Sequence, residues 1–261
     1  MILASCGEIA FEIFGYPIHY YGIIMGVSIF CGIMLSYFIC KKFFKELNPD
    51  VIFDVGIPVI IGAIIGARLY YCLFAYDYYF SHPINIVKIY EGGLSIHGAI
   101  IGGVIAGAVY TKNKKLPFLK LCDIFSFGLV LGQGIGRWGN FFNNEAFGRP
   151  YNGFIKLFVP FDCRPFGYEN FEYFHPTFLY ESILNIFILL ILFLVLKYSY
   201  SEKKSGKIFF TYLICYSIVR FCIESIRIDS VFNIANIPLA QIVSLIILFF
   251  SLLCMYRKQL F

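Results

Sequence analysis

The chain has 261 residues, of which 59% are hydrophobic, 20% are aromatic and only 14% are charged. A soluble domain carries about 25% charged residues, so this composition excludes an ordinary soluble protein. The net charge of +5 does not indicate nucleic-acid binding, because the lysines lie in short segments between apolar runs.

Apolar runs of about 18 residues or more, the length that crosses a bilayer as a helix, recur along the whole chain. We therefore predict an all-α integral membrane protein with seven transmembrane helices. The predicted spans are 20–40, 52–74, 95–111, 121–139, 179–197, 208–226 and 238–256. They leave no room for a separate soluble domain, so we expect residues 1–261 to form a single transmembrane domain.

Basic residues follow every second predicted span. Those after the first, third and fifth spans are all lysines: Lys41, Lys42, Lys45, Lys112, Lys114, Lys115, Lys120, Lys197, Lys203, Lys204 and Lys207. Arg257 and Lys258 follow the last span. Because basic loops remain in the cytoplasm, we expect the amino terminus outside and the carboxyl terminus in the cytoplasm.

The arginines are distributed differently from the lysines. Six of the seven lie in spans or on the predicted outer side: Arg68, Arg137, Arg149, Arg164, Arg220 and Arg227. An arginine in hydrocarbon costs about 2.5–3.5 kcal/mol, and its planar fork binds phosphate or carboxylate through two parallel hydrogen bonds. This predicts arginines that hold an anion. The alternative is that each one pairs with a protein acid or caps carbonyls, most readily Arg68, which precedes a tyrosine pair.

The first span begins with the sequence HYYG at 19–22, which places His19 and Tyr21 at the predicted outer interface. Both are candidate site residues. The alternative is a role in the aromatic belt that many membrane proteins carry at the headgroup level.

The third span opens with EGGLSIHGAIIGG, which places His97 about one turn inside an apolar helix. An imidazole there can act as a general base, a proton relay or a hydrogen-bond donor to phosphate. The alternative is a structural histidine bonded across helices. Small residues four apart, such as Gly98 and Gly102, predict that neighbouring helices approach closely.

The fourth span ends with GLVLGQGIGRWGNFFNNEAFGRP. Its glycines at every fourth position, Gly128, Gly132 and Gly136, by themselves indicate only a packing face. They lead directly to Arg137, Asn140, Glu145 and Arg149. Glycines, arginines, an amide and a carboxylate so close together predict a cradle for the headgroup of an anionic lipid.

The segment 140–178 between the fourth and fifth spans is aromatic, polar and rich in proline. A connection of that length is usually functional, and we expect it over the outer leaflet with its Tyr and Phe at headgroup level. The fifth span then opens with HPTFLYE, in which Pro176 starts the helix and Glu181 lies just inside it.

The sixth span contains Tyr216, Arg220, Glu224 and Arg227 on roughly one helical face. Glu224 can neutralise Arg220 and orient its guanidinium while the free edge meets a phosphate. The alternative is a self-contained structural ion pair.

No metal site and no cofactor are expected. The four histidines are scattered without metal-ligand spacing, and no nucleotide-binding loop occurs. The nine cysteines include no CxxC pair. Their odd number and lack of pattern argue against a disulfide framework, and most are interpreted as small buried hydrophobes.

Taken together, five segments of the chain resemble the prolipoprotein diacylglyceryl transferase family. They are HYYG at 19–22, EGGLSIHG at 91–98, GRWGNFFNNEAFGR at 136–149, HPTFLYE at 175–181 and YSIVRFCIESIR at 216–227. The segments have the family's order, and the similarity covers nearly the whole chain with the same seven-span plan.

The resemblance implies an enzyme of the bacterial cytoplasmic (inner) membrane with its active site toward the outer leaflet. The family transfers the diacylglyceryl group of phosphatidylglycerol to the thiol of the lipobox cysteine in a prolipoprotein signal peptide. A thioether forms and glycerol phosphate leaves, which is the first step of lipoprotein maturation. The implied partners are this lipid, the signal peptide and membrane lipids, with no nucleic acid.

Matched position by position, the family's catalytic residues correspond to His97, Arg137, Arg220 and Tyr21. With the motif analysis, the candidate substrate-binding residues are Arg137, Asn140, Glu145, Gly148, Arg149, Tyr216, Glu224, Arg227 and His19. Where the family commonly has Asn-Gly-Glu, this chain has Asn143-Asn144-Glu145. Asn tolerates a left-handed backbone better than most residues, so we expect the turn to survive.

Two other classes of function remain open. A transporter of an anionic substrate would also carry intramembrane arginine and glutamate, but the two related halves typical of such proteins are not evident in the sequence. A lipid-binding scaffold would tolerate His97→Gln. For the enzyme, the sequence leaves open whether His97 is the base or a donor to the phosphate. We expect the lipid to enter sideways between helices.

Overall fold

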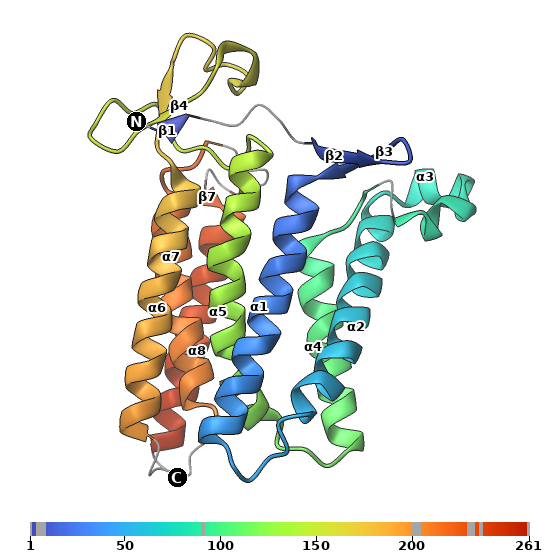
Figure 1. Cartoon of the computed structure of the whole chain (residues 1–261), viewed down its shortest axis with the longest axis vertical. Helices are drawn as coiled ribbons and strands as arrows, with labels where there is room; N and C mark the ends of the chain where they lie inside the picture. The colour runs from blue at the N-terminus through green and yellow to red at the C-terminus, as the bar shows by residue number, and fades with distance from the viewer. Residues whose placement is uncertain are drawn as a thin grey trace. The chain divides into compact units, whose positions relative to one another are not determined.

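A computed structural model of the chain describes residues 2–3, 9–89, 92–199, 205–228, 233–234 and 237–259. Long helices dominate it (Figure 1): α1 (Tyr20–Phe43), α2 (Val51–Phe74), α4 (Ile96–Asn113), α5 (Phe118–Phe142), α6 (Thr177–Ser199), α7 (Lys207–Glu224) and α8 (Leu239–Gln259). Each of the predicted spans coincides with one of these helices to within a few residues.

Within the described ranges, five helices are long and apolar enough to cross a membrane: α1, α2, α5, α6 and α8. Their outward faces are apolar, and α8, for example, leaves Phe249 and Leu253 more than half exposed. Such surfaces require a lipid or protein neighbour. The chain is therefore an all-helical integral membrane protein. The shorter α4 and α7 are more polar, and α7 carries Lys207, Arg220 and Glu224 within 18 residues.

The chain forms two compact units, one of residues 37–122 and one of residues 1–36 with 123–261. In the first unit, α2 and α4 pack through glycines. A Cβ atom added to Gly98 would lie 2.2 Å from the carbonyl oxygen of Gly66, and one added to Gly102 would lie 2.2 Å from that of Gly62. Only residues without side chains allow this approach, which confirms the expected small-residue contact of the third span.

Arg68 fastens the connection between α2 and α4, which contains α3 (Tyr76–Ser81) and the 3-10 turn η1 (Pro83–Val87). Its guanidinium donates to five backbone carbonyls at 2.5–3.2 Å, those of Asn85, Ile86, Lys88, Gly92 and Gly93. The side chain is only 5% exposed. Arg68 therefore caps carbonyls, as the alternative interpretation of the sequence held, and does not hold an anion.

In the second unit, α1 and α5 pack through the predicted glycine face. A Cβ atom on Gly128 would lie 2.2 Å from the carbonyl oxygen of Gly32, and one on Gly132 would lie 3.2 Å from that of Ser28. At the start of α7, the buried carboxylate of Asp123 accepts hydrogen bonds from the backbone N–H groups of Gly206 (2.5 Å) and Phe209 (2.8 Å). These bonds satisfy donors that a helix start leaves unpaired.

The 140–178 segment folds around its own apolar cluster. Phe147, Leu157, Val159, Phe174 and Phe178 are buried together. Strand β4 (Leu157–Phe158) lies between β1 (Ile2–Leu3), which is parallel to it, and β5 (Tyr173–Phe174), which is antiparallel. The remaining strands form two small hairpins: β2 (Ile9–Ile13) with β3 (Tyr16–His19), and β6 (Asn233–Ile234) with β7 (Ile237–Pro238).

Two side chains of this segment correct the sequence interpretation. Cys163, in the 3-10 turn η3 (Phe161–Cys163), is disulfide-bonded. A single disulfide leaves no repeated cysteine spacing, so the sequence pattern did not reveal it. Arg164 donates to the carbonyls of Val159 (3.1 Å) and Glu169 (2.6 Å), so it too fastens its own segment.

Candidate active site

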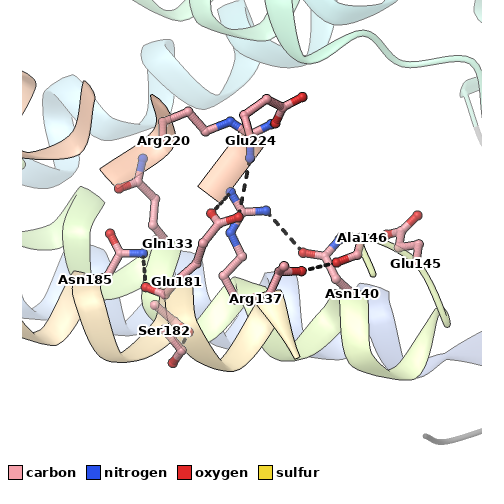
Figure 2. A network of polar contacts seen from close by, with 12 residues as sticks. Gln133, Arg137, Asn140, Glu145, Ala146, Glu181, Ser182, Asn185, Arg220 and Glu224 are labelled. Atoms are coloured by element: carbon pink, nitrogen blue, oxygen red, sulfur yellow. Dashed lines mark hydrogen bonds and ion pairs between the residues drawn. The ribbon is translucent and has the colours of Figure 1, made fainter. Parts of the chain in front are cut away.

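The candidate site lies where three helices of the second unit end or begin. The last turns of α5 bring Arg137 and Asn140, the first turns of α6 bring Glu181, and the last turns of α7 bring Arg220 and Glu224 (Figure 2). Alternation of helix direction explains the meeting, because α5 and α7 run toward the end of the unit from which α6 starts. Residues far apart in the sequence therefore share one polar cluster.

Glu181 joins the two arginines. Its Oε2 lies 2.6 Å from Nη2 of Arg137, and its Oε1 lies 3.3 Å from Nη1 of Arg220. Arg220 also contacts Oε2 of Glu224 at 2.6 Å, through Nη2. The predicted Arg220–Glu224 pair is thus confirmed, but it is not self-contained. It is one end of a four-residue chain of alternating charge, which we call the arginine cluster: Arg137, Glu181, Arg220 and Glu224.

Burial differs between the acids and the bases of the arginine cluster. The Glu181 and Glu224 side chains are 2% and 5% exposed, whereas those of Arg137 and Arg220 are 20% and 19% exposed. A guanidinium has five N–H donors, and the described contacts leave some of these free on each arginine. The carboxylates therefore fix the orientation of both guanidinium groups while part of each edge stays available to a further anion.

Asn140 extends the cluster toward the turn that follows α5. Its Oδ1 accepts a hydrogen bond from Nη1 of Arg137 (3.3 Å), and its Nδ2 donates to Oε1 of Glu145 (2.8 Å). The turn has positive φ at Asn144 (51°) and at Ala146 (61°). The expectation that an asparagine takes the left-handed conformation at this position is confirmed. Glu145 is thereby aimed back at Asn140.

Gly148 permits a close approach between the turn and the start of α6. A Cβ atom there would lie 2.5 Å from the Cβ of His175, and its N–H donates to the His175 carbonyl (3.1 Å). The next residue, Arg149, donates its backbone N–H to the carbonyl of Ile226 (2.8 Å), and Gly148 and Arg227 form a β-bridge. Gly148 is thus a packing residue in this structure, and the Arg149 side chain is exposed.

The His175 ring is held between two tyrosines. It stacks on Tyr151 with 3.8 Å between ring centroids, and its Nδ1 lies 3.2 Å from the Tyr180 hydroxyl. Burial lowers the pKa of His175 below its ordinary value, because desolvation disfavours the charged ring. The neutral form therefore prevails at pH 7.

Tyr21 lies directly against the backbone of the site. A Cβ atom on Gly139 would lie 2.8 Å from Cδ2 of Tyr21, so the glycine between Arg137 and Asn140 makes room for this ring. The preceding Tyr20 stacks on Phe142 at 4.5 Å. His19, at the end of β3, is exposed. The structure thus brings Tyr21 to the end of α5 and gives His19 no comparable contact among the described residues.

Further polar side chains lie on α5 and α7, farther from the helix ends than the arginine cluster. Tyr216 stacks on Tyr212 at 5.9 Å, and the Tyr212 hydroxyl accepts a hydrogen bond from Nε2 of Gln133 (2.9 Å). Tyr216 is one turn of α7 before Arg220, on the same face. It therefore continues the polar face below the arginine cluster.

His97 belongs to the other compact unit, that of residues 37–122. It is the second residue of α4, not one turn inside, because the helix starts at Ile96 after the extended Ser95. The ring is exposed and lies 6.0 Å from the Tyr70 ring. Among the described residues it has no hydrogen-bond partner, so the alternative of a histidine bonded across helices finds no support there. Its role relative to the arginine cluster stays a prediction.

Glu181 is the site residue that sequence reasoning noted without assigning it a role. The signal that could have identified it is an acid inside a long apolar helix, which requires a cationic partner. Gln133 and Asn185 were not noted at all, because single amides in apolar helices have no distinctive spacing. Asn185 is 1% exposed and donates to the Glu181 carbonyl at 2.8 Å (Figure 2).

The chain is similar over most of its length to proteins of one family. Residues 8–257 match the family described as prolipoprotein diacylglyceryl transferase. A protein of Trichormus variabilis named phosphatidylglycerol–prolipoprotein diacylglyceryl transferase is 43% identical over 94% of this chain and 86% of its own length. Proteins of the same name from Acaryochloris marina and Synechococcus elongatus are 43% and 40% identical, over 94% and 95% of this chain and 88% and 86% of their own lengths. The chain therefore belongs to the prolipoprotein diacylglyceryl transferase family.

Proposed function

We propose that this protein transfers the diacylglyceryl group of phosphatidylglycerol to the thiol of a prolipoprotein's lipobox cysteine. The new bond is a thioether between the cysteine sulfur and the glyceryl carbon, and the bond that breaks releases glycerol phosphate. Family membership over nearly the whole chain supports this reaction. The names of the similar proteins contain both substrates.

One observation carries the proposal: Arg137 and Arg220 are joined by the buried Glu181 and keep partly exposed guanidinium edges. A phosphodiester headgroup bears one negative charge, and the departing phosphate monoester gains another. Donors that are fixed before the reaction stabilise such growing charge without reorganisation, commonly by about 3–4 kcal/mol each. Two guanidinium groups oriented by the shared carboxylate of Glu181 fit this requirement.

The nucleophile needs separate activation, because a free thiol has a pKa of about 8.5 and the thiolate is the reactive form. We assign this step to His97 acting as a general base. The alternative is that the thiol ionises unaided and His97 donates to the phosphate. Tyr21, whose ring lies against Gly139, is proposed to contact the headgroup beside Asn140.

We further propose a single transmembrane domain with seven spans, the amino terminus outside and the site toward the outer leaflet. The lysines after alternate spans support this orientation. The disulfide at Cys163 supports it too, since disulfides persist on the oxidising side of a bacterial membrane. Thiol-specific labelling of intact cells at single cysteines placed in 44–50 and in 151–156 would test it, and labelling of the first set alone would contradict it.

The transferase proposal is tested with the purified chain in lipid nanodiscs. Phosphatidylglycerol with a labelled acyl chain and a lipobox peptide are supplied, and the peptide mass and the released glycerol phosphate are measured. We expect one glycerol phosphate per thioether, undiminished in EDTA, and no transfer from phosphatidylcholine. A folded wild-type protein that modifies no peptide, or that moves an anionic lipid between leaflets instead, would refute the proposal.

The pH dependence of the transfer rate distinguishes the two proposed roles of His97. If His97 is the base, the rate of His97→Gln recovers as the pH rises toward about 8.5, where the thiol ionises by itself. If His97 donates to phosphate, the loss is the same at every pH in this range. A ratio of wild-type to variant rate that falls between pH 7 and pH 9 decides for the base.

A further inference from the structure

An apolar cleft of about 340 Å³ opens between α1, α5 and α6, beside the arginine cluster. Four of its lining residues are buried: Val130, Gly134, Ser182 and Asn185. The others are almost all apolar and include Val27 and Ile186, which are about half exposed. The cleft is therefore accessible from the apolar outer face of these helices.

The cleft starts next to the charged site. Trp138 and Ser182, which line it, directly follow Arg137 and Glu181 in the sequence. From Trp138 it extends along α5 to Val130, which is about 12 Å at the helical rise of 1.5 Å per residue. One leaflet of the hydrocarbon core is about 15 Å thick. The cleft thus has nearly the length of one leaflet.

Both polar side chains that line the cleft donate a hydrogen bond to a backbone carbonyl. The Ser182 hydroxyl donates to the Gly134 carbonyl (2.9 Å), and Nδ2 of Asn185 donates to the Glu181 carbonyl (2.8 Å). An apolar channel of leaflet length that begins at an anion-binding cluster matches a lipid whose phosphate lies at the arginines. We propose that this cleft holds one acyl chain of the phosphatidylglycerol donor and that Gly134 keeps it open.

This inference rests on the proposed function, and Gly134 makes it testable. A Cβ atom on Gly134 would lie 3.5 Å from the Cβ of Asn185 and 3.7 Å from the Ser182 carbonyl oxygen, which is ordinary contact. Gly134→Ala is therefore tolerated, and the methyl groups of Gly134→Val project into the cleft. Gly26→Val on α1 is the matched control, because no heavy atom lies within 4 Å of a Cβ atom there and Gly26 does not line the cleft.

The first measurement does not depend on catalysis. Trp138 is the only tryptophan of the chain and lines the cleft, so its fluorescence reports contact with brominated acyl chains. In nanodiscs, brominated phosphatidylglycerol should quench about twofold more than brominated phosphatidylcholine at equal mole fraction. Gly134→Val should abolish this difference, and Gly26→Val should preserve it. Equal quenching by both lipids in the wild type would overturn the inference even if transfer occurs.

The second measurement compares donors of different chain length. For Gly134→Val we expect kcat/KM to fall at least tenfold with dipalmitoyl phosphatidylglycerol and less than twofold with a dioctanoyl donor, with Gly134→Ala intermediate. An equal fall for both donors, or a raised KM for the peptide alone, would overturn the inference, the latter in favour of the signal peptide as occupant. If the wild type shows selective quenching but no transfer from any donor, the proposed function fails instead.

Discussion

Arg68 and the arginine cluster show two ways in which a membrane protein satisfies a buried guanidinium. Arg68 donates its five N–H groups to five backbone carbonyls and is 5% exposed. Arg137 and Arg220 instead contact carboxylates and an amide, and about a fifth of each side chain remains exposed. Burial alone therefore does not identify a ligand-binding arginine. A ligand-binding arginine is identified instead by the N–H donors that its protein contacts leave free.

The comparison predicts that removing a cluster arginine affects the reaction more than any other change. We expect Arg137→Ala to lower kcat/KM by about 100- to 1,000-fold, the usual effect of losing one preorganised donor to a developing charge. Arg137→Lys should recover little, since a point charge does not replace the planar fork. The transfer assay in nanodiscs measures this. Arg257→Ala, an exposed arginine at the end of α8, is the matched control.

Removing Arg68 should affect stability rather than chemistry. Arg68→Ala leaves five carbonyls of the α2–α4 connection without their donor, and we expect the free energy of unfolding to fall by about 3 kcal/mol. Unfolding of the purified protein in detergent measures the loss. A variant Arg68→Ala that kept full stability and lost transfer would contradict the structural role of Arg68, because Arg68 would then act in the site.

Neutralising the shared acid tests why the cluster contains carboxylates at all. In Glu181→Gln the two arginines lose the anion that balances them, so they should bind a phosphate ligand more tightly. We expect glycerol phosphate to inhibit about tenfold more strongly and kcat to fall about tenfold through slower product release. Unchanged inhibition with reduced stability would mean that Glu181 is only structural.

A smaller effect is expected at the turn that positions Glu145. Asn144 has a φ of 51°, a conformation that disfavours residues with a Cβ atom and an apolar side chain. Asn144→Ala should lower the free energy of unfolding by about 1 kcal/mol, and Asn144→Gly should leave it nearly unchanged. A loss with glycine equal to that with alanine would show that the amide side chain, not the backbone, is what matters.

The smallest expected effect is the pH response of His175. Its pKa is lowered from the ordinary value of 6.5 by burial, so the folded state favours the neutral ring. This contribution to stability is present above pH 6.5 and is lost as the pH falls through the lowered pKa. The thermal midpoint of the wild type should therefore drop more between pH 7.5 and pH 5.5 than that of His175→Phe. Parallel curves would exclude a role for this ring.

Much of the helical framework was predictable because its signals are local. A run of apolar residues long enough to span a bilayer becomes a helix wherever it occurs, since hydrocarbon leaves backbone groups no other partner. The glycines at every fourth position likewise predicted close helix contacts on α4 and α5, and the structure identifies α2 and α1 as their partners. The folded core of the 140–178 segment was not predictable, because Phe147, Leu157 and Phe174 lie far apart in sequence and meet through strand pairing.

The candidate site was predicted in part, for a related reason. Arg220 and Glu224 lie one turn apart on a single helix, so their pairing follows from helical spacing alone. The link from Arg137 through Glu181 to Arg220 joins three helices, and no spacing in the sequence encodes it. The left-handed Asn144 was expected from its residue type, because asparagine tolerates this backbone conformation.

The sequence by itself determined the residue types and the helices on which they lie, because helix formation and side-chain periodicity depend on near neighbours. It also distinguished lysine from arginine along the chain, and so pointed to an anion. Only the tertiary structure decided which arginines retain donors for that anion. The packing of α5, α6 and α7 sets the partners of Arg137 and Arg220, whereas the backbone of one connection takes all five donors of Arg68.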